Sequence, residues 1–170
     1  SHYLRDSAFE LFARLAPRWS ADPEMPSYAV DLARFELLAF EVRNAPDDPP
    51  IEAPRPLALD RRVVIALATR VVRFAHAVHA LPEDEASTEP PAAEPVILCA
   101  YRDAELEMRT LVLTRSAAEI LERLIAGATL GEAVSGAALA CGAALDPPFL
   151  QGAARLLEDL GERGVVRGAS

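Results

Sequence analysis

The sequence predicts an α+β fold, with an N-terminal helical region followed by a C-terminal winged-helix-like domain. Three observations predict it. Apolar residues recur at helical spacing in the first part of the chain. β-branched runs that are typical of strands follow a proline-rich stretch. The last part holds three amphipathic segments, two of which are joined by a glycine turn as in a helix-turn-helix. We place the boundary near residue 54, with a helical region over residues 1–54 and the winged-helix-like domain over residues 55–170.

The N-terminal region is expected to hold two helices. Apolar side chains recur at helical spacing over residues 3–16, and Pro17 should end this helix because proline lacks the N–H that the ladder needs. Pro26 should open a longer helix that carries an apolar stripe from Tyr28 to Val42. The proline-rich residues 45–56 then predict a stiff, extended linker.

The next part of the chain predicts strands. Residues 61–66 and 69–75 are rich in β-branched side chains. Residues 96–102 and 105–113, separated by Asp103 and Ala104, predict a β-hairpin. The acidic, proline-rich residues 82–95 predict a loop. The closing residues 164–168 are expected to add a short last strand.

Three helices should follow the hairpin. Ser116 with Glu119, and Thr129 with Glu132, have the spacing of capping boxes at two helix starts. In the stretch LIAGATLGEAVSGA, residues 124–137, Gly127 lies between those two helices. The pair Pro147–Pro148 predicts the start of the third helix.

Charge argues against nucleic-acid binding. The chain carries 26 acidic and 17 basic residues, a net charge of −9. There is no basic residue between Arg123 and Arg155, so the second helix of the helix-turn-helix has no cation for phosphate. The third helix carries Arg155 and Arg163 among a larger number of acidic residues. We therefore expect no DNA partner. The alternative hypothesis is that the protein is a winged-helix transcriptional regulator, which would bind DNA.

A winged-helix domain can instead bind a peptide that adds a strand to its sheet. This mode needs an open strand and an apolar groove rather than a basic face. The strand within residues 105–113 and the leucines around Leu156 can supply both. The other reading is an ordinary sheet edge that Glu105, Glu107 and Arg109 protect. Sequence physics alone leaves both readings open.

Signals for catalysis and metal binding are weak. His76 and His79 form an HxxH pair that could bind a metal on a helix, but an extended segment would direct them to opposite faces. No hydrolase, zinc-protease or phosphate-loop motif is present, and we assemble no Ser/His/Asp group. We therefore expect no catalytic residue and no metal ligand, and a stand-alone metalloenzyme using the two histidines is a further rival.

The same features suggest where the protein works. No stretch is long and apolar enough to span a membrane, and the opening residues do not resemble a signal peptide. The two cysteines, Cys99 and Cys141, lie far apart and form no CxxC pair. We expect a cytoplasmic protein with reduced thiols and no membrane partner.

Five stretches together resemble the HvfC/BufC-like family, which was once described as a DNA-binding domain. They are SHYLRD, PSYAVDLARFELLAFEV, RVVRFAHAVHAL, VILCAYRDAELEMRTLVLT and AAEILERLIAGATLGEAV, in the order and spacing of that family. Its members are partner subunits of multinuclear non-heme iron oxidases. Those oxidases modify precursor peptides of ribosomally made natural products. Members carry a further N-terminal helical segment, so we expect residues upstream of Ser1.

The resemblance implies a non-catalytic subunit that binds an iron oxidase and presents a precursor peptide. The iron would belong to the oxidase, so no cofactor is expected in this chain. The C-terminal domain would be similar to a peptide-recognition element. The residues that the resemblance assigns to the peptide are Met108, Arg109, Thr110, Leu111 and Leu156. The residues that it assigns to the oxidase are Tyr28, Phe35, Glu36, His76 and His79.

Two positions depart from the family pattern. A proline is typical before the Val-His pair, whereas this chain has Ala77, so the turn should be less rigid. A tryptophan is typical after Glu36, whereas this chain has Leu37, which removes an aromatic side chain from the expected contact with the oxidase.

Overall fold

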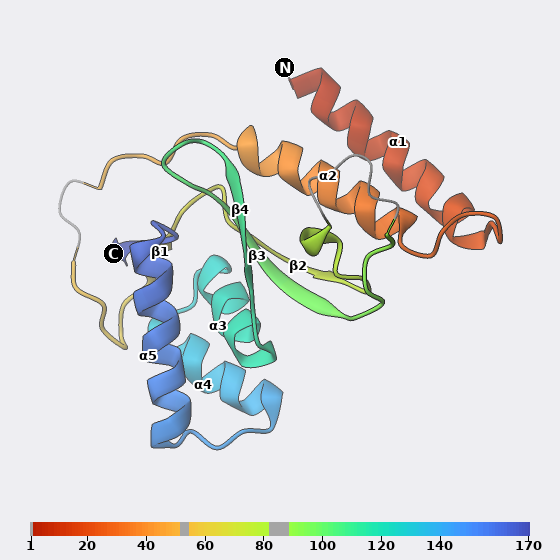
Figure 1. Cartoon of the computed structure of the whole chain (residues 1–170). Coiled ribbons are helices and arrows are strands. Elements are labelled where there is room, and N and C mark those ends of the chain that lie inside the picture. The colour runs from red at the N-terminus through yellow and green to blue at the C-terminus, as the bar shows by residue number, and fades with distance from the viewer. Residues whose placement is uncertain (1, 52–54, 82–88) are drawn as a thin grey trace.

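The computed structural model describes residues 2–51, 55–81 and 89–170, and for residues 2–8 the backbone alone. The fold is α+β, as the sequence predicts, with helices first and strands followed by helices later (Figure 1). The helices are α1 (His2–Ala21), α2 (Ala29–Arg43), the 3-10 helix η1 (Val78–Ala80), α3 (Arg115–Ile125), α4 (Leu130–Cys141) and α5 (Pro147–Glu162). The strands are β1 (Val63–Ile65), β2 (Arg70–Phe74), β3 (Val96–Arg102), β4 (Met108–Val112) and β5 (Val166–Ala169).

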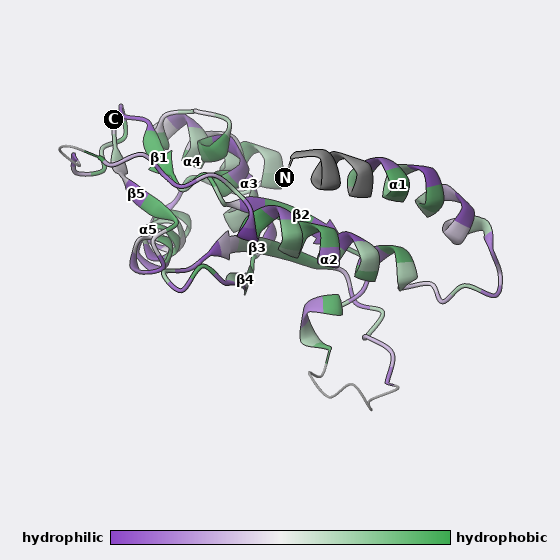
Figure 2. Ribbon diagram, turned by 90° about the horizontal axis from the view of Figure 1, so that it is seen from above, coloured by the Kyte–Doolittle hydropathy of each residue, from purple (hydrophilic) through white to green (hydrophobic). Residues whose placement is uncertain are grey.

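A three-stranded antiparallel sheet in the order β2-β3-β4 lies between two groups of helices. Helices α1 and α2 lie on one side of it, and α3, α4 and α5 lie on the other (Figure 1). The central strand β3 is mostly hydrophobic (Figure 2) and sends side chains to both sides. Leu98 and Ala100 enter the core that includes α2, whereas Cys99 and Tyr101 enter the core that includes α3 to α5. The period of two in a strand explains this division.

A second, two-stranded sheet joins β1 to β5. This pairing confirms the expected short last strand and brings the end of the chain back to the start of the C-terminal part. Val165 and Val166 thereby join the core under α3 to α5.

Helix α1 does not end at Pro17, as the sequence predicts, but continues to Ala21. Proline inside a helix removes one ladder hydrogen bond. The rings of Phe12 and Trp19 contact each other edge to face across this position, with centroids 6.4 Å apart. That contact favours the helix on both sides of the proline.

The start of α2 also differs from the prediction. The helix begins at Ala29, and Pro26 instead belongs to the preceding turn, where its carbonyl accepts a 2.9 Å hydrogen bond from the Ala29 N–H. The apolar stripe of α2 is a core face, as expected. Leu38 and Val42 are buried against the sheet, and Phe35 packs on the ring of Phe74.

Asp31 joins α2 to the end of β2. Its side chain is 10% exposed, and its Oδ2 accepts hydrogen bonds from the backbone N–H groups of Ala75 and His76 and contacts His76 Nδ1 at 2.9 Å. Its Oδ1 pairs with Arg34 at 3.4 Å. We call these contacts the Asp31 clasp, and they place the turn after β2 on the first turn of α2.

The clasp changes the geometry expected for the two histidines. The two histidines lie neither on a regular α-helix nor on a continuous strand, because the chain bends after Phe74 and forms η1. His76 is therefore fixed on Asp31, and His79 lies on η1.

The caps of the C-terminal helices are partly as predicted. Thr129 and Glu132 form the expected capping box at α4, and the Thr129 hydrogen bonds lower the pKa of Glu132. The predicted box at Ser116 is wrong, because Thr114 is the N-cap of α3 and accepts a hydrogen bond from the Ala117 N–H. Gly127 has a φ of 87° and ends the α3 turn, as expected for a helix-turn-helix.

The hairpin is confirmed, with a longer turn than predicted. β3 matches residues 96–102, and β4 pairs with it from Met108 to Val112. The connection covers residues 103–107, where Leu106 has a φ of 65° that non-glycine residues rarely adopt. The predicted boundary near residue 54 and residues 82–88 of the predicted loop lie outside the described residues.

We predict that Asp31→Asn destabilises the protein by about 1–3 kcal/mol, because the neutral amide loses the charge that strengthens the hydrogen bonds from the Ala75 and His76 N–H groups and turns its own NH2 group toward Arg34. Urea unfolding followed by circular dichroism would measure the change. Asp22→Asn is a matched control, since Asp22 is exposed and caps only the nearby Glu24 N–H. Equal unfolding midpoints for the Asp31 variant and the wild type would contradict this role.

Burial raises the pKa of the Cys99 thiol to about 12, and Cys99 is fully buried, whereas Cys141 is partly exposed. The thiolate is the reactive form, so we predict that only Cys141 reacts with a chromogenic disulfide in the folded protein at mildly alkaline pH. Both thiols should react in denaturant. Two fast thiols in the folded state would show that the core around Cys99 opens readily.

Candidate functional site: the β4 edge and its groove

Strand β4 has only one neighbour, β3, among the described residues. The Leu113 N–H donates to the Ile97 carbonyl at 2.8 Å, which makes these two a hydrogen-bonded pair. Such pairs alternate along an antiparallel ladder. Arg109 and Leu111 therefore bond to β3. The remaining backbone groups point away from it, and they belong to Met108, Thr110 and Val112.

No backbone partner of those outward groups occurs in the described part of the chain. We call this row of N–H and C=O groups the β4 edge. An extended peptide could pair with it, as in β-strand addition. The strand is short and ends at the start of α3, so the edge offers places for only a few peptide residues.

An apolar groove of about 490 Å³ lies beside the β4 edge. It runs between the end of β4, the first turns of α3 and the part of α5 from Pro148 to Asp159. Side chains from all three elements line it, including Leu111, Ala117, Ile120, Phe149 and Leu156. Helix α5 carries Gly152 on this wall, and no other atom lies within 4 Å of the place where a Cβ would stand. The glycine keeps this part of the groove open.

The structure brings together two of the residues that the sequence assigns to the peptide. Leu111 and Leu156 face the same groove from β4 and α5. Met108 and Thr110 contribute backbone groups to the edge, and Met108 packs against the core beneath α2. Arg109 points its guanidinium to Asp103 within the hairpin, and this hydrogen bond lowers the pKa of the Asp103 carboxyl.

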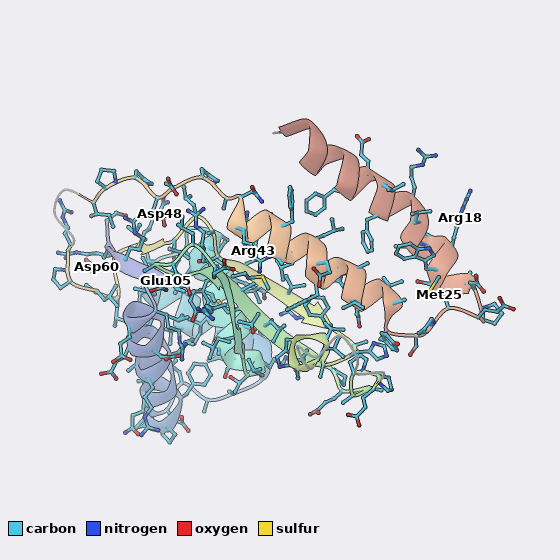
Figure 3. The ribbon with its side chains drawn as sticks, turned by 45° about the horizontal axis from the view of Figure 1, so that its top comes forward. Arg18, Met25, Arg43, Asp48, Asp60 and Glu105 are labelled. Carbon is cyan, nitrogen blue, oxygen red and sulfur yellow. The ribbon has the colours of Figure 1, made fainter. Side chains whose placement is uncertain are left out.

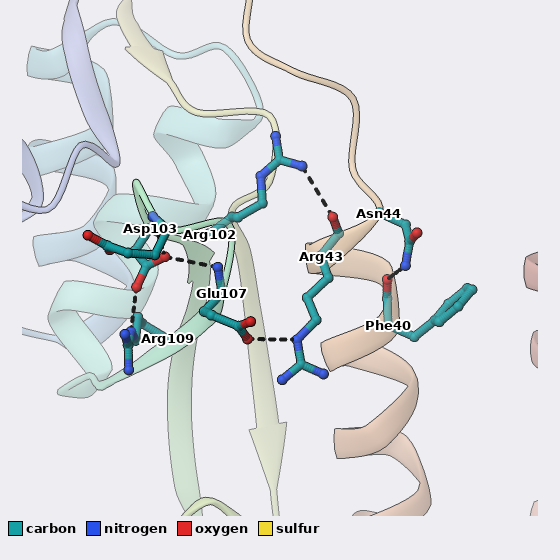
Figure 4. Close-up of polar contacts among 8 residues, drawn as sticks. Phe40, Arg43, Asn44, Arg102, Asp103, Glu107 and Arg109 are labelled. Carbon is teal, nitrogen blue, oxygen red and sulfur yellow. Dashed lines mark hydrogen bonds and ion pairs between the residues drawn. The ribbon is translucent and has the colours of Figure 1, made fainter.

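Polar contacts hold the hairpin on α2. Arg43 at the end of α2 pairs with Glu107 at 3.3 Å, and Arg102 donates to the Arg43 carbonyl (Figure 4). Arg102 also donates to the Ala45 carbonyl at 2.7 Å. Two of the three charges that could protect the edge, Glu107 and Arg109, form ion pairs at the hairpin tip.

Charge in the groove is sparse. Arg163 pairs with Asp159 at 2.9 Å and also donates a hydrogen bond to the Tyr101 hydroxyl. These two hydrogen bonds raise the pKa of the Arg163 guanidinium. Arg155 is exposed at the groove and forms no ion pair or hydrogen bond with the described residues. Arg155 is therefore the one lining cation without a partner in the described structure.

A second cavity of about 550 Å³ shares Val112 and Leu113 with the groove. Its other walls come from η1 and from the segment before β3, including His79 and Glu94. Neither this cavity nor the positions of Phe149 and Gly152 in the wall of the groove were predicted from the sequence. A glycine inside an otherwise amphipathic helix was the sequence feature that could have pointed to Gly152, because such a glycine often has a packing or functional reason.

The residues assigned to the oxidase lie around α2 and η1. The ring of Tyr28 contacts His76 edge to face, with centroids 6.4 Å apart. Glu36 is exposed, whereas Phe35 is half-buried on Phe74. His79 lies on η1, and its Nδ1 is buried without a hydrogen-bond partner among the described residues.

His76 Nε2 also contacts the Ser27 hydroxyl at 3.1 Å, so Ser27, His76 and Asp31 form a chain that the sequence analysis did not assemble. The order matches a Ser-His-Asp relay. Asp31 nevertheless accepts two backbone N–H groups and pairs with Arg34, which are the contacts of a structural clasp.

Among the residues that the structure describes, no three His, Cys, Asp or Glu side chains gather where they could hold a metal ion. None of the described helices has the length and apolar character needed to cross a bilayer.

The comparison with known families gives one match. The model of the HvfC C-terminal domain matches residues 67–161, which is more than half of the chain and includes β2 to α4 and most of α5. No curated protein matches the chain. The matched part contains the β4 edge and its groove, and the chain belongs to the HvfC family.

Proposed function

We propose that this protein is a non-catalytic subunit that binds an extended precursor peptide on the β4 edge and presents it to an iron-dependent oxidase. The observation that carries the proposal is the position of the apolar groove directly beside the unpaired backbone groups of β4. Family membership supports it, because the resemblance to HvfC/BufC-like proteins implies such a role.

The β4 edge and the groove would make different contributions to peptide binding. Each backbone hydrogen bond contributes about 0.5–1.5 kcal/mol net, because water is displaced from both partners. A leucine-sized side chain buried in the groove contributes roughly 1.5–3 kcal/mol. The groove should therefore supply most of the affinity, whereas pairing with Thr110 and Val112 sets the orientation of the peptide.

The alternative is a winged-helix transcriptional regulator. Helix α4 carries no basic residue, and the Arg163 guanidinium of α5 is held by Asp159 and Tyr101. Arg155 alone cannot provide the several phosphate contacts that DNA affinity requires. These features favour a peptide as the ligand, and salt-dependent retention on DNA would favour the alternative.

The oxidase would contact the surface formed by α2 and η1. This surface faces away from α3 to α5 (Figure 1), so an oxidase bound there leaves the groove accessible. Of the residues expected to contact the oxidase, Glu36 is exposed and Tyr28 is half-exposed. Phe35 supports the surface by packing on Phe74, and His76 supports it through its contact with Asp31. The iron would be held by the oxidase, and this chain would contribute shape and orientation.

We predict that Thr110→Pro abolishes binding of peptides selected from a displayed library of short random sequences. Proline removes an outward N–H, and edge strands tolerate proline where the N–H faces solvent. Thr110→Val keeps the N–H and should bind as the wild type does. Fluorescence anisotropy with a labelled selected peptide measures both, and undiminished binding by Thr110→Pro would exclude strand addition.

The groove has its own test. Gly152→Leu should fill it and reduce affinity at least tenfold, because the apolar anchor loses its place. Gly161→Leu is the control, since Gly161 lies on the same helix, also has open space around it, and does not line the groove. If both leucine variants bind as tightly as the wild type, the peptide does not use this groove.

The proposed partner is tested by co-expression with a multinuclear iron oxidase of the kind that the family resemblance implies. We expect the tagged protein to retain the oxidase and Glu36→Arg to weaken that retention, because Glu36 is exposed on the proposed surface. Glu158→Arg, an exposed site on α5, is the control. Stoichiometric iron bound by this chain alone, with no oxidase retained, would favour a stand-alone metalloenzyme.

A further inference from the structure

The two cavities meet at the end of β4, where both are lined by Val112 and Leu113, and their other walls come from different elements. Leu111 and Leu113 face the core under α3 to α5, and the groove lies on that face. Val112 has the opposite direction because side chains alternate along a strand, and it is 57% exposed. Of the two cavities, the second has residues of η1 in its wall, and η1 packs with α2 on that opposite face of the sheet.

A strand that pairs with β4 has the same alternation. Residues directly opposite each other in an antiparallel pair point to the same face. The peptide residue opposite Val112 would therefore enter the second cavity. Its neighbour, opposite Leu111 or Leu113, would enter the groove. Consecutive peptide residues are thus read by two different cavities.

The cavities carry opposite unpaired charges. Arg155 lines the groove, and Glu94 is exposed at the second cavity. Neither side chain forms an ion pair with another described residue, whereas Asp159, the other charge in the groove, is held by Arg163. The remaining lining of both cavities is mainly apolar, and its polar side chains are Thr114 and Ser116 in the groove and His79 in the second cavity.

We propose that the peptide is read as two adjacent residues of opposite charge, a basic one toward Glu94 and an acidic one toward Arg155. The proposal rests on the proposed function, because it needs a strand on the β4 edge. Apolar stems of the two residues contact the cavity walls, and their charged ends reach the rims. Each partly exposed pair contributes specificity more than affinity.

Selection from the displayed random library tests this with three proteins. Peptides selected by the wild type should contain a basic residue next to an acidic one. Arg155→Glu should replace the acidic preference by Lys or Arg, and Glu94→Lys should replace the basic preference by Asp or Glu. A peptide selected on the wild type should bind each reversed protein roughly threefold to tenfold more weakly.

Arg18→Glu is the control, because Arg18 is exposed on α1 at the far end of the molecule from α5 (Figure 3). It should select the same peptides as the wild type. Circular dichroism confirms that each variant folds, and both reversed charges are at exposed positions.

The outcomes separate the two proposals. The two-residue reading would be overturned if peptides require the Thr110 N–H but show no charge preference. It would also be overturned if their charge preference is unchanged by both reversals. Either result would still support strand addition. Peptides that bind Thr110→Pro as well as the wild type would overturn both.

Discussion

Unpaired backbone groups on the outer side of β4 are the constraint on which the proposed recognition depends. The hydrogen bond from the Leu113 N–H to Ile97 sets the register, and the register directs Met108, Thr110 and Val112 outward. An exposed edge invites pairing with other chains. Here it lies beside an apolar groove, so a peptide can bury side chains where it forms backbone hydrogen bonds.

The rest of the fold holds that edge in place. The Asp31 clasp fixes the turn after β2 on α2, and Arg43 fixes the hairpin tip through Glu107. On the other face, Arg73 of β2 binds the carboxylate of Glu122 in α3, which lowers the pKa of Glu122. Both groups of helices are therefore tied to the same sheet. An oxidase on α2 and a peptide on β4 would share one rigid support.

Local patterns predicted the fold well because they carry local physics. Residue types at short spacing predict the limits of β3, the capping box at Thr129 and the start of α5 at Pro147. The clasp could not be predicted, because nothing near Asp31 indicates that a histidine 45 residues later will meet it. For the site, Leu111 and Leu156 were expected from the fold type and the family. The two cavities and the pairing of Arg163 depend on side-chain positions that no spacing encodes.

Amide hydrogen exchange, resolved residue by residue by NMR, tests strand addition most directly. Adding a saturating peptide selected from the random library should slow exchange at the outward N–H groups of Thr110 and Val112. Exchange at Arg109 and Leu111, whose N–H groups already bond to β3, should change much less. Protection confined to α4 or α5, with Thr110 and Val112 exchanging as in the free protein, would contradict the account.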